Sequence, residues 1–358
     1  MISGRILAIE TSCDETAAAV VDGGREIVAS VVASQVALHA PTGGIVPEVA
    51  ARAHLRWIVP VLEEARERAG IRDWSEVEAV AVTEGPGLAG SLLVGINAAK
   101  TLAWVHGRPL VPVNHLEGHI YAAWLRPEGG AESREPEFPL VALVVSGGHT
   151  FLVEMRDHLD YRLLGQTIDD AAGEAFDKVG RLLGLPYPGG PAIMRAAAAA
   201  EQLDRRFPRA WLGDSYDFSF SGLKTAARRA VELERGSHGK VSSGPSSGGS
   251  PLSESTVAEL AWAFQESVVE VLATKTGRAA ERVGARAIVL GGGVAANAML
   301  RERIHGRAAA LGIPLIVPAP ELCTDNAAMI GAAGFHRARA GTRATAELDA
   351  RPSLKLAV

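Results

Sequence analysis

Two histidines four residues apart, His115 and His119, have the spacing of a metal-binding pair. They lie in Asn114–His119 (NHLEGH), directly after the apolar run Pro109–Val113, which predicts a strand giving way to a helix. On a helix, residues i and i+4 share one face, so both imidazoles can face a single ion. The same spacing also occurs in helices whose histidines only pack or cap, so a third ligand has to decide between the two interpretations.

Asp325 is the candidate third ligand. It lies in the polar loop Pro318–Asn326, just before a small-residue helix predicted at Ala327–Phe335. An aspartate in this place often caps the helix instead, and that alternative stays open. Two histidines and one carboxylate leave open coordination positions and suit Fe²⁺ or Zn²⁺, with Mg²⁺ as a further alternative.

The nearest rival for the histidine pair is a zinc protease. That motif places its catalytic glutamate immediately after the first histidine, where it projects beside the metal. Here Glu117 comes two residues after His115, which puts it about 200° further round a helix. The spacing therefore excludes the protease and leaves Glu117 without a predicted role.

Acidic residues elsewhere could also act on a ligand. Asp14 and Glu15 lie in a predicted turn, where they could bind metal, position a water or orient a nucleophile; solvated turn acids are the alternative. Asp170, Glu174 and Asp177 would share one face of a helix. Such a face is usually only solvated, but Asp170 and Asp177 would also suit gripping ligand hydroxyls.

Two strand–turn–strand segments must position these residues. Arg5–Ser12 and Ala17–Val21 flank one turn, and Pro139–Val145 and Phe151–Met155 flank another. The repeat indicates an internal duplication of two α/β lobes. Tight turns present several backbone N–H groups, and glycines such as those at 147 and 148 let a phosphate approach the chain, although plain hairpins look the same.

Composition bounds the class of protein. The chain has 358 residues, enough for about two domains, with 47% apolar and 22% charged residues. Its two cysteines, Cys13 and Cys323, argue against a disulfide scaffold and for a cytoplasmic location. No signal peptide and no apolar run of about 20 residues is visible, so we expect no membrane partner. The net charge of −5 means that nucleic acid would need a local patch or a helper protein.

Eight motifs, in this order along almost the whole chain, carry a specific resemblance. They are Ile9–Thr16, Gly43–Glu48, Gly85–Leu88, Asn114–His119, Val145–Thr150, Tyr187–Pro191, Phe218–Thr225 and Cys323–Asn326. Together they resemble the TsaD/Kae/OSGEP family, the tRNA threonylcarbamoyladenosine transferases, and are closest to the bacterial type. The resemblance implies an α/β, actin-like ATPase (ASKHA) fold in which two duplicated lobes enclose a ligand cleft.

The resemblance also implies a domain plan. The N-terminal lobe is expected at 1–127, with a helical insertion at about 35–70, and a linker follows at 128–138. The C-terminal lobe is expected at 139–358. A Ser/Gly-rich stretch at about 236–255 departs from shorter members of the family, and we expect it to form a flexible surface insertion.

The activity implied is transfer of a threonylcarbamoyl group from threonylcarbamoyl-adenylate to N6 of the adenosine next to the anticodon, in tRNAs reading codons that begin with A. AMP is released. By motif, the family's metal, most often Fe²⁺, would be bound by His115, His119 and Asp325. Asp14 and Glu15 would be catalytic. The residues expected to bind the adenylate are Val145, Ser146, Gly147, Gly148, His149, Asp177, Gly190 and Asn297.

Partners follow from the same resemblance. They are tRNA, an actin-like paralogous subunit (TsaB type) and a small P-loop ATPase (TsaE type). Basic residues such as Lys224, Arg228 and Arg229 could help to hold tRNA, although a basic helix face is more often only solvated. Two other hypotheses stay open: a carbamoyltransferase or kinase of the same fold with a small-molecule acceptor, and a non-catalytic subunit, which should lack the metal ligands.

Overall fold

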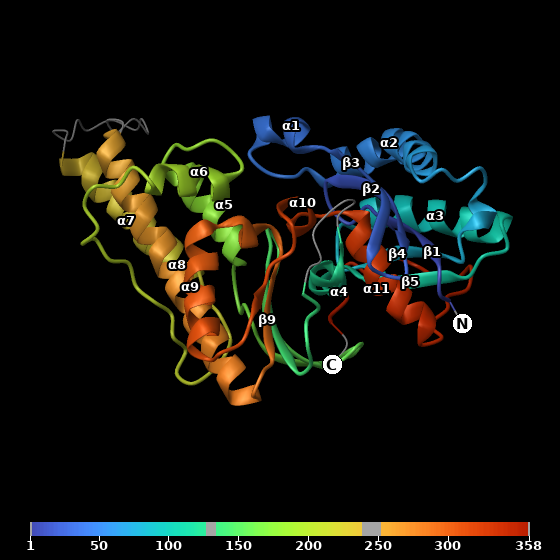
Figure 1. The fold of residues 1–358 in the computed structure, drawn as a ribbon. Helices are drawn as coiled ribbons and strands as arrows, with labels where there is room; N and C mark the ends of the chain where they lie inside the picture. The colour runs from blue at the N-terminus through green and yellow to red at the C-terminus, as the bar shows by residue number, and fades with distance from the viewer. Residues whose placement is uncertain (1, 127–133, 238–251, 357–358) are drawn as a thin grey trace.

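The computed structural model describes residues 2–126, 134–237 and 252–356. Two five-stranded sheets form its frame (Figure 1). The first sheet has the order β3 (Glu26–Ser34), β2 (Glu15–Asp22), β1 (Arg5–Glu10), β4 (Ala79–Gly85) and β5 (Leu110–Asn114). The second has the order β8 (Asp160–Gln166), β7 (Thr150–Asp157), β6 (Leu140–Val145), β9 (Ala287–Gly291) and β10 (Leu315–Ile316).

The two sheets share one topology. In each, the first three strands in sequence are antiparallel neighbours, the fourth strand joins the first in parallel, and the fifth joins the fourth in parallel. The strands next to the predicted turns, β1 with β2 and β6 with β7, are the corresponding pairs. The predicted duplication of two α/β lobes is therefore confirmed.

Two helices cover the outer face of the first sheet. They are α2 (Pro47–Arg68) and α3 (Ala89–Val105), and α2 follows the short α1 (Val36–His39). Pro47 stands at the first turn of α2, where its missing N–H costs no hydrogen bond. The predicted helical insertion at about 35–70 thus contains α1 and α2.

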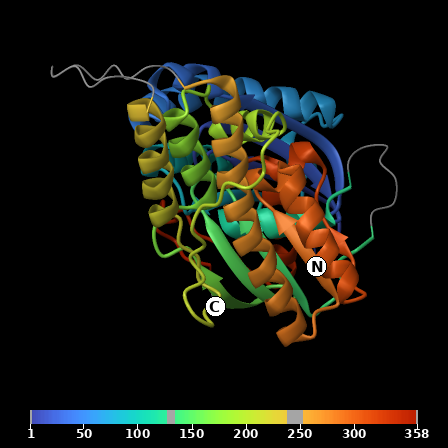
Figure 2. The same cartoon turned by 90° about the vertical axis from the view of Figure 1, so that its left-hand side faces the viewer.

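Helices of the second lobe form an outer layer over the second sheet, as Figure 2 shows. They are α5 (Ala172–Leu182), α6 (Gly189–Ala197), α7 (Ser221–Ser237), α8 (Glu254–Val283) and α9 (Ala298–Ala310), with the short α10 (Pro320–Cys323) nearby. Because α5 begins at Ala172, Asp170 precedes the helix, and the prediction that it shares a helix face with Asp177 is wrong. Most of the predicted insertion at 236–255 and part of the linker at 128–138 lie outside the described residues.

Two helices lie between the sheets and join the lobes. These are α4 (His115–Tyr121) and α11 (Ala327–Arg339), which pack on each other. Ile120 of α4 and Met329 of α11 belong to the same apolar cluster as Ile6 of the first sheet and Leu140 of the second. This shared core fixes the two lobes around α4.

The chain returns to the first lobe at its end. Helix α11 packs on β1, β2 and β5, although the predicted boundaries, 139–358, assign it to the second lobe. Its glycines explain the packing: a Cβ on Gly331 would lie 2.7 Å from Val21 Cγ2, and one on Gly334 would lie 2.6 Å from Ala81 Cβ. Small residues let the helix backbone approach a sheet closely, but their pattern in the sequence does not indicate which of the two sheets α11 packs on.

The described part of the chain contains no helix of the length and apolarity needed to span a membrane.

Candidate metal centre

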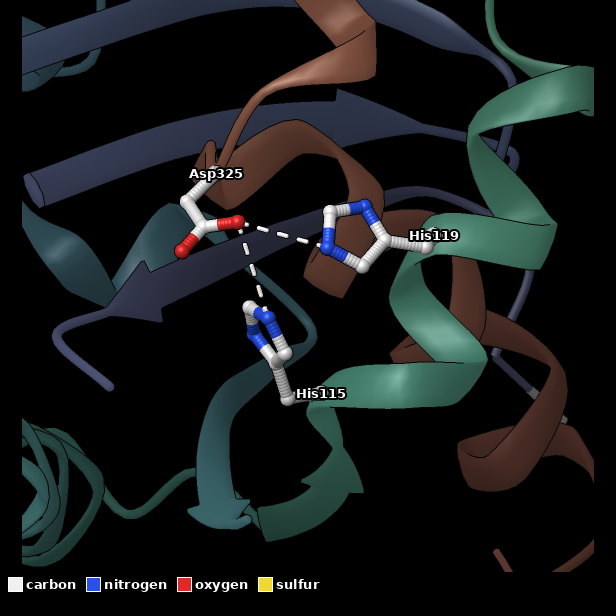
Figure 3. Close-up of side chains that lie close together, drawn as sticks. All are labelled: His115, His119 and Asp325. Atoms are coloured by element: carbon white, nitrogen blue, oxygen red, sulfur yellow. Dashed lines mark ion pairs between the residues drawn. The ribbon is translucent and has the colours of Figure 1, made fainter. Parts of the chain in front are cut away.

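The three predicted metal ligands meet at one point between the lobes (Figure 3). The Nε2 atom of His115 lies 3.5 Å from Asp325 Oδ1, and the Nε2 atom of His119 lies 3.3 Å from the same oxygen. Both histidines are buried. The structure therefore brings together residues separated by about 200 positions in the way the metal hypothesis requires.

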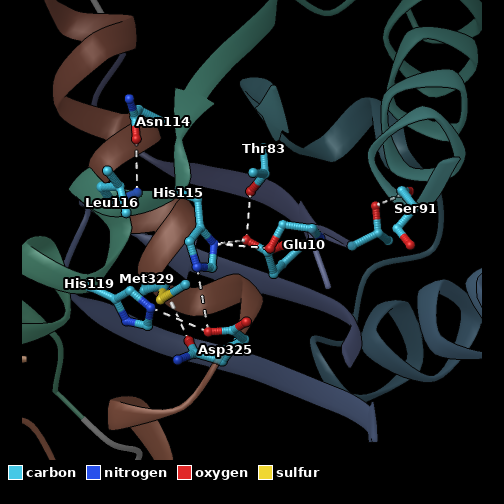
Figure 4. A network of polar contacts seen from close by, with 12 residues as sticks. Glu10, Thr83, Ser91, Asn114, His115, Leu116, His119, Asp325 and Met329 are labelled. Atoms are coloured by element: carbon cyan, nitrogen blue, oxygen red, sulfur yellow. Dashed lines mark hydrogen bonds and ion pairs between the residues drawn. The ribbon is translucent and has the colours of Figure 1, made fainter. Parts of the chain in front are cut away.

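Capping side chains place the ligands. Asn114 ends β5, and its Oδ1 accepts a hydrogen bond of 2.9 Å from Leu116 N, which starts α4 at His115. Asn326 caps α11 in the same way through Met329 N, also at 2.9 Å (Figure 4). Because Asn326 takes the capping role, Asp325 is free to turn its carboxylate toward the histidines.

The donor set fits a divalent metal ion. The Nδ1 atom of His119 is buried and has no hydrogen-bond partner among the described residues, and Nε2 has only the contact with Asp325 Oδ1 at 3.3 Å; for a buried imidazole this is a costly state unless the ring binds something. Two ligand atoms about 2.1 Å from a tetrahedral ion would be about 3.4 Å apart. The observed separations of 3.3 and 3.5 Å match this value.

Glu10 supports the site from behind and was missed by the sequence reasoning. It is fully buried at the end of β1; its Oε2 lies 2.9 Å from His115 Nδ1 and accepts from Thr83 Oγ1 at 2.7 Å. With Nδ1 donating to Glu10, Nε2 of His115 is left to face Asp325 (Figure 4). A charged residue closing an otherwise apolar strand was the available signal.

The charged groups of the site shift one another's pKa values. Burial alone would lower the pKa of His115, but the carboxylates of Asp325 and Glu10 outweigh burial and raise it to about 9. In return, against the effect of burial, the charge of His115 holds the pKa of Asp325 and that of Glu10 below their usual values. The surroundings therefore favour positive charge at this point, which a divalent cation also supplies.

Glu117 points away from the metal ligands. Its carboxylate accepts two hydrogen bonds from Arg337 of α11, from Nε at 2.5 Å and from Nη2 at 2.8 Å. The exclusion of a protease-like glutamate beside the metal agrees with this geometry. Glu117 instead ties α4, which carries the histidines, to α11, which follows Asp325.

The first turn, between β1 and β2, borders the ligands. Ser12 Oγ lies 3.2 Å from His115 Nδ1. Burial raises the pKa of Glu15 to about 10, and the negative charges of Asp325 and Asp14 add to this effect. Glu15 is thus an electrostatic neighbour of the metal ligand Asp325, and Asp14 is a neighbour of Glu15.

The second turn, between β6 and β7, also lies near the metal ligands. Ser146 N donates to His149 O at 2.8 Å, and the His149 ring centroid lies 6.5 Å from that of His115. Burial, with the nearby His115 and His119, lowers the pKa of His149 to about 4. A Cβ on either Gly147 or Gly148 would meet no atom within 4 Å, so open space adjoins this backbone.

A cavity of about 240 Å³ lies beside this turn in the second lobe; we call it the Asp177 cavity. Four of the residues predicted to bind the adenylate line it: Gly147, Asp177, Gly190 and Asn297. Its apolar walls come from Phe176, Pro188, Pro191, Met194 and Val294. The other four predicted residues, Val145, Ser146, Gly148 and His149, belong to the same strand end and turn but do not line this cavity.

Asp177 and Asn297, two polar residues of the cavity, also stabilise the fold. Asp177 Oδ1 accepts from Gly189 N at 2.7 Å at the start of α6, and Asn297 Oδ1 caps α9 through Leu300 N at 3.0 Å. Each helix thus begins at the cavity wall, and in α6 the carboxylate of Asp177 already occupies the place of an anion at the helix start. Lys224 was predicted to help to hold tRNA. In the structure its Nζ forms an ion pair with Asp170 Oδ2 at 3.0 Å.

Solved structures show the fold. Full-length HypF in its phosphate- and nucleotide-bound form superimposes with a TM-score of 0.60 at 13% identity, over 95% of this chain and 47% of HypF. The HypF of T. kodakarensis gives a TM-score of 0.59 at 14% identity, over 95% of this chain and 48% of that one. The predicted actin-like fold class, with two α/β lobes, is confirmed.

Sequence comparison shows the family. The profile described as tRNA N6-adenosine threonylcarbamoyltransferase (TsaD) matches residues 26–332. A protein of that name from Thermomicrobium roseum is 57% identical, over 98% of this chain and 96% of its own length. One from Symbiobacterium thermophilum is 50% identical, over 99% and 98%. The chain therefore belongs to the tRNA N6-adenosine threonylcarbamoyltransferase family.

Proposed function

We propose that this chain transfers a threonylcarbamoyl group from threonylcarbamoyl-adenylate to N6 of the adenosine next to the anticodon, in tRNAs reading codons that begin with A. The observation that carries the proposal is the juxtaposition of His115, His119 and Asp325 with the Asp177 cavity, across the turn between β6 and β7. The family membership supplies the substrate class.

We assign the binding of a divalent metal, Fe²⁺ by preference, to His115, His119 and Asp325. When bound, such an ion polarises a carbonyl or phosphoryl oxygen as a Lewis acid. The few polar contacts of the buried His119 ring and the separations between the ligand atoms support this assignment. Glu10 would keep His115 in the tautomer that ligation needs.

The adenylate would be held by the second lobe. Its adenosine part fits the apolar Asp177 cavity, with Gly147, Gly190 and Asn297 along the wall. Its phosphate would lie against the turn from Val145 to His149, where backbone without an obstructing Cβ permits close approach at Gly147 and Gly148.

In the reaction, the N6 amine attacks the carbamoyl carbon and a C–N bond forms. The bond from that carbon to the phosphate oxygen breaks, and AMP leaves with the bonding electron pair while N6 loses one proton. An aromatic amine is a weak nucleophile, so positioning of the two substrates supplies much of the rate. We assign catalytic roles to Asp14 and Glu15, because Glu15 is close enough to Asp325 and to Asp14 for their charges to shift its pKa.

Partner subunits would bind outside the cleft. The outer face of α2 exposes Leu55 and Val59, one helical turn apart, with exposed fractions of 66% and 63%. Exposed apolar rows of this kind mark protein interfaces. We propose that the actin-like paralogue (TsaB type) docks there, and that a TsaE-type P-loop ATPase assists turnover in the cytoplasm, where tRNA is found.

The decisive experiment supplies the protein, its paralogue and the ATPase with threonylcarbamoyl-adenylate and unmodified tRNA. Nucleosides from the digested tRNA should contain threonylcarbamoyladenosine, and AMP should appear in equal amount. Free adenosine in place of tRNA serves as the control for a small-molecule acceptor. Unmodified tRNA in the complete mixture would refute the proposed function.

Metal binding is tested separately by elemental analysis of His115→Ala and Asp325→Ala proteins. Each substitution removes one of the three ligands, so metal content should fall well below that of the unaltered protein. His336→Phe, a change at a histidine outside the cluster, is the control. Equal metal content in all four proteins would refute the site.

A further inference from the structure

A second cavity, of about 390 Å³, lies on the opposite side of the turn between β6 and β7. We call it the Phe151 cavity. Gly148 and His149 line it, whereas the preceding Gly147 lines the Asp177 cavity. The turn therefore separates the Phe151 cavity from the Asp177 cavity. The volume is within the range of about 300–1,000 Å³ typical of small-molecule sites.

The Phe151 cavity lies near the metal centre. Leu116, which lines it, directly follows the ligand His115 on α4. His149, which also lines it, has its ring centroid 6.5 Å from that of His115. One wall of the cavity therefore belongs to the helix and the turn that adjoin His115.

The lining has the character of a nucleobase site. Apolar walls are contributed by Pro86, Leu116, Phe151, Leu163, Leu354 and Leu356. Gln166, Ser353 and Lys355 line the same cavity and are exposed, so they form its polar rim. Apolar and aromatic side chains pack on the faces of unstacked bases, and a lysine at the rim suits the phosphates of the RNA chain.

The wall formed by the chain's last described residues is anchored. Pro352 O accepts a hydrogen bond from Gly87 N at 3.1 Å, and Lys355 O accepts one from Asn114 Nδ2 at 2.9 Å. Leu356 is buried in the apolar cluster between the lobes. Asn114 also caps α4, so the same side chain holds both the cavity wall and the helix that carries His115.

We propose that the Phe151 cavity receives the acceptor adenosine of tRNA, flipped out of the anticodon loop, while the adenylate occupies the Asp177 cavity. This inference rests on the proposed function and assigns its second substrate. The amine must reach the carbamoyl carbon while the adenylate still occupies its own site, so the two substrates need separate, adjoining spaces. The turn at Gly147–Gly148 provides this separation, with one substrate on either side.

Two matched substitutions test the assignment. Leu163→Trp fills the Phe151 cavity, and Met194→Trp fills the Asp177 cavity. For Leu163→Trp we expect the KM for tRNA to rise about tenfold or more, the worth of stacking one base, with the dissociation constant for AMP unchanged. Met194→Trp should do the reverse, weakening AMP binding with little effect on the KM for tRNA. Melting temperatures verify that both proteins are folded.

Gly148→Val provides a second variant should Leu163→Trp fail to fold. A Cβ at Gly148 meets no atom within 4 Å, so a side chain there extends into the cavity without a clash. It too should raise the KM for tRNA. A normal KM for tRNA in the folded variants, or weakened AMP binding in Leu163→Trp, would overturn the acceptor site alone. Failure of the unaltered protein to modify tRNA would overturn the proposed function and the acceptor site together.

Discussion

At the scale of single residues, Glu10 determines which nitrogen of His115 is available. Its carboxylate only accepts hydrogen bonds when ionised, so it selects the tautomer with the proton on Nδ1. Thr83 Oγ1 and the backbone N–H of Ser12 donate to the same carboxylate and hold it in place. A buried acid with three donors is stable enough to orient a ligand without touching the metal.

Glu10→Gln should weaken metal binding by about tenfold, because the neutral amide orients His115 less strongly and no longer increases its basicity. Metal titration of the purified protein gives the dissociation constant. Glu84→Gln is the matched control: it alters a neighbouring buried carboxylate whose nearest charged partner is Arg351, 3.9 Å away. Equal metal affinity in the Glu10→Gln and unaltered proteins would contradict the assigned role.

At the scale of elements, the metal site depends on how α4 lies against α11. The contact is close, since a Cβ on Gly118 would lie 2.9 Å from Ile330 Cδ1. The ion pair of Glu117 and Arg337 fixes the axial register of α4 relative to α11 through two parallel hydrogen bonds. The histidines and Asp325 are thereby kept in register.

Arg337→Met should lower the free energy of unfolding by about 3–5 kcal/mol, since it leaves the Glu117 carboxylate buried without its cation. Chemical denaturation measures this loss, and metal affinity should fall with it. Arg209→Met is the control, because Arg209 pairs with Glu266 and, at 2.8 Å, with Glu270 in the second lobe. It should destabilise the protein but spare metal affinity; equal losses of affinity in both variants would contradict the coupling.

A stacked histidine pair lies at the far end of the same two helices. The rings of His158 and His336 are 3.7 Å apart, and Tyr121 Oη lies 3.2 Å from His158 Nδ1. Burial, followed by the charges of His158 and Arg339, lowers the pKa of His336 to about 3. Burial also lowers the pKa of His158. The folded protein therefore keeps the His336 ring neutral in mild acid.

These shifts predict a pH dependence of stability. Below pH 6.5 the unfolded chain binds protons that the folded His336 refuses until its pKa of about 3, so stability should fall as the pH falls through this window. His336→Phe preserves the stacking and removes the titrating group. Its stability should decline less between pH 6.5 and the pKa of about 3, as urea titrations at several pH values would show; an identical slope would contradict the prediction.

At the scale of the whole molecule, the outer face of α2 should decide assembly. Replacing Leu55 and Val59 together by Asp places two charges on an exposed apolar row. Co-elution with the paralogue should be lost, whereas AMP binding and the melting temperature should stay as they are. Trp104→Asp, at an 85% exposed residue of α3, is the control. Undiminished co-elution of the α2 variant would exclude this face.

The sequence predicts local features well and distant pairings poorly. The helical spacing of His115 and His119 alone indicates a shared face, and the two strand–turn–strand segments indicate the duplication. Glu10 and His115, or Glu117 and Arg337, are more than 100 residues apart, and no periodicity links them. Such contacts arise from the packing of α4 and α11 between the sheets, which composition does not encode.

The return of α11 to the first sheet has a consequence for synthesis on the ribosome. The face of β1 that carries Ile6 and Ala8 packs in one cluster with Met329 and Ile330, which are made more than 300 residues later. A nascent N-terminal lobe therefore emerges with an uncovered apolar surface until α11 has been synthesised, and the metal ligands meet only after Asp325 has been added.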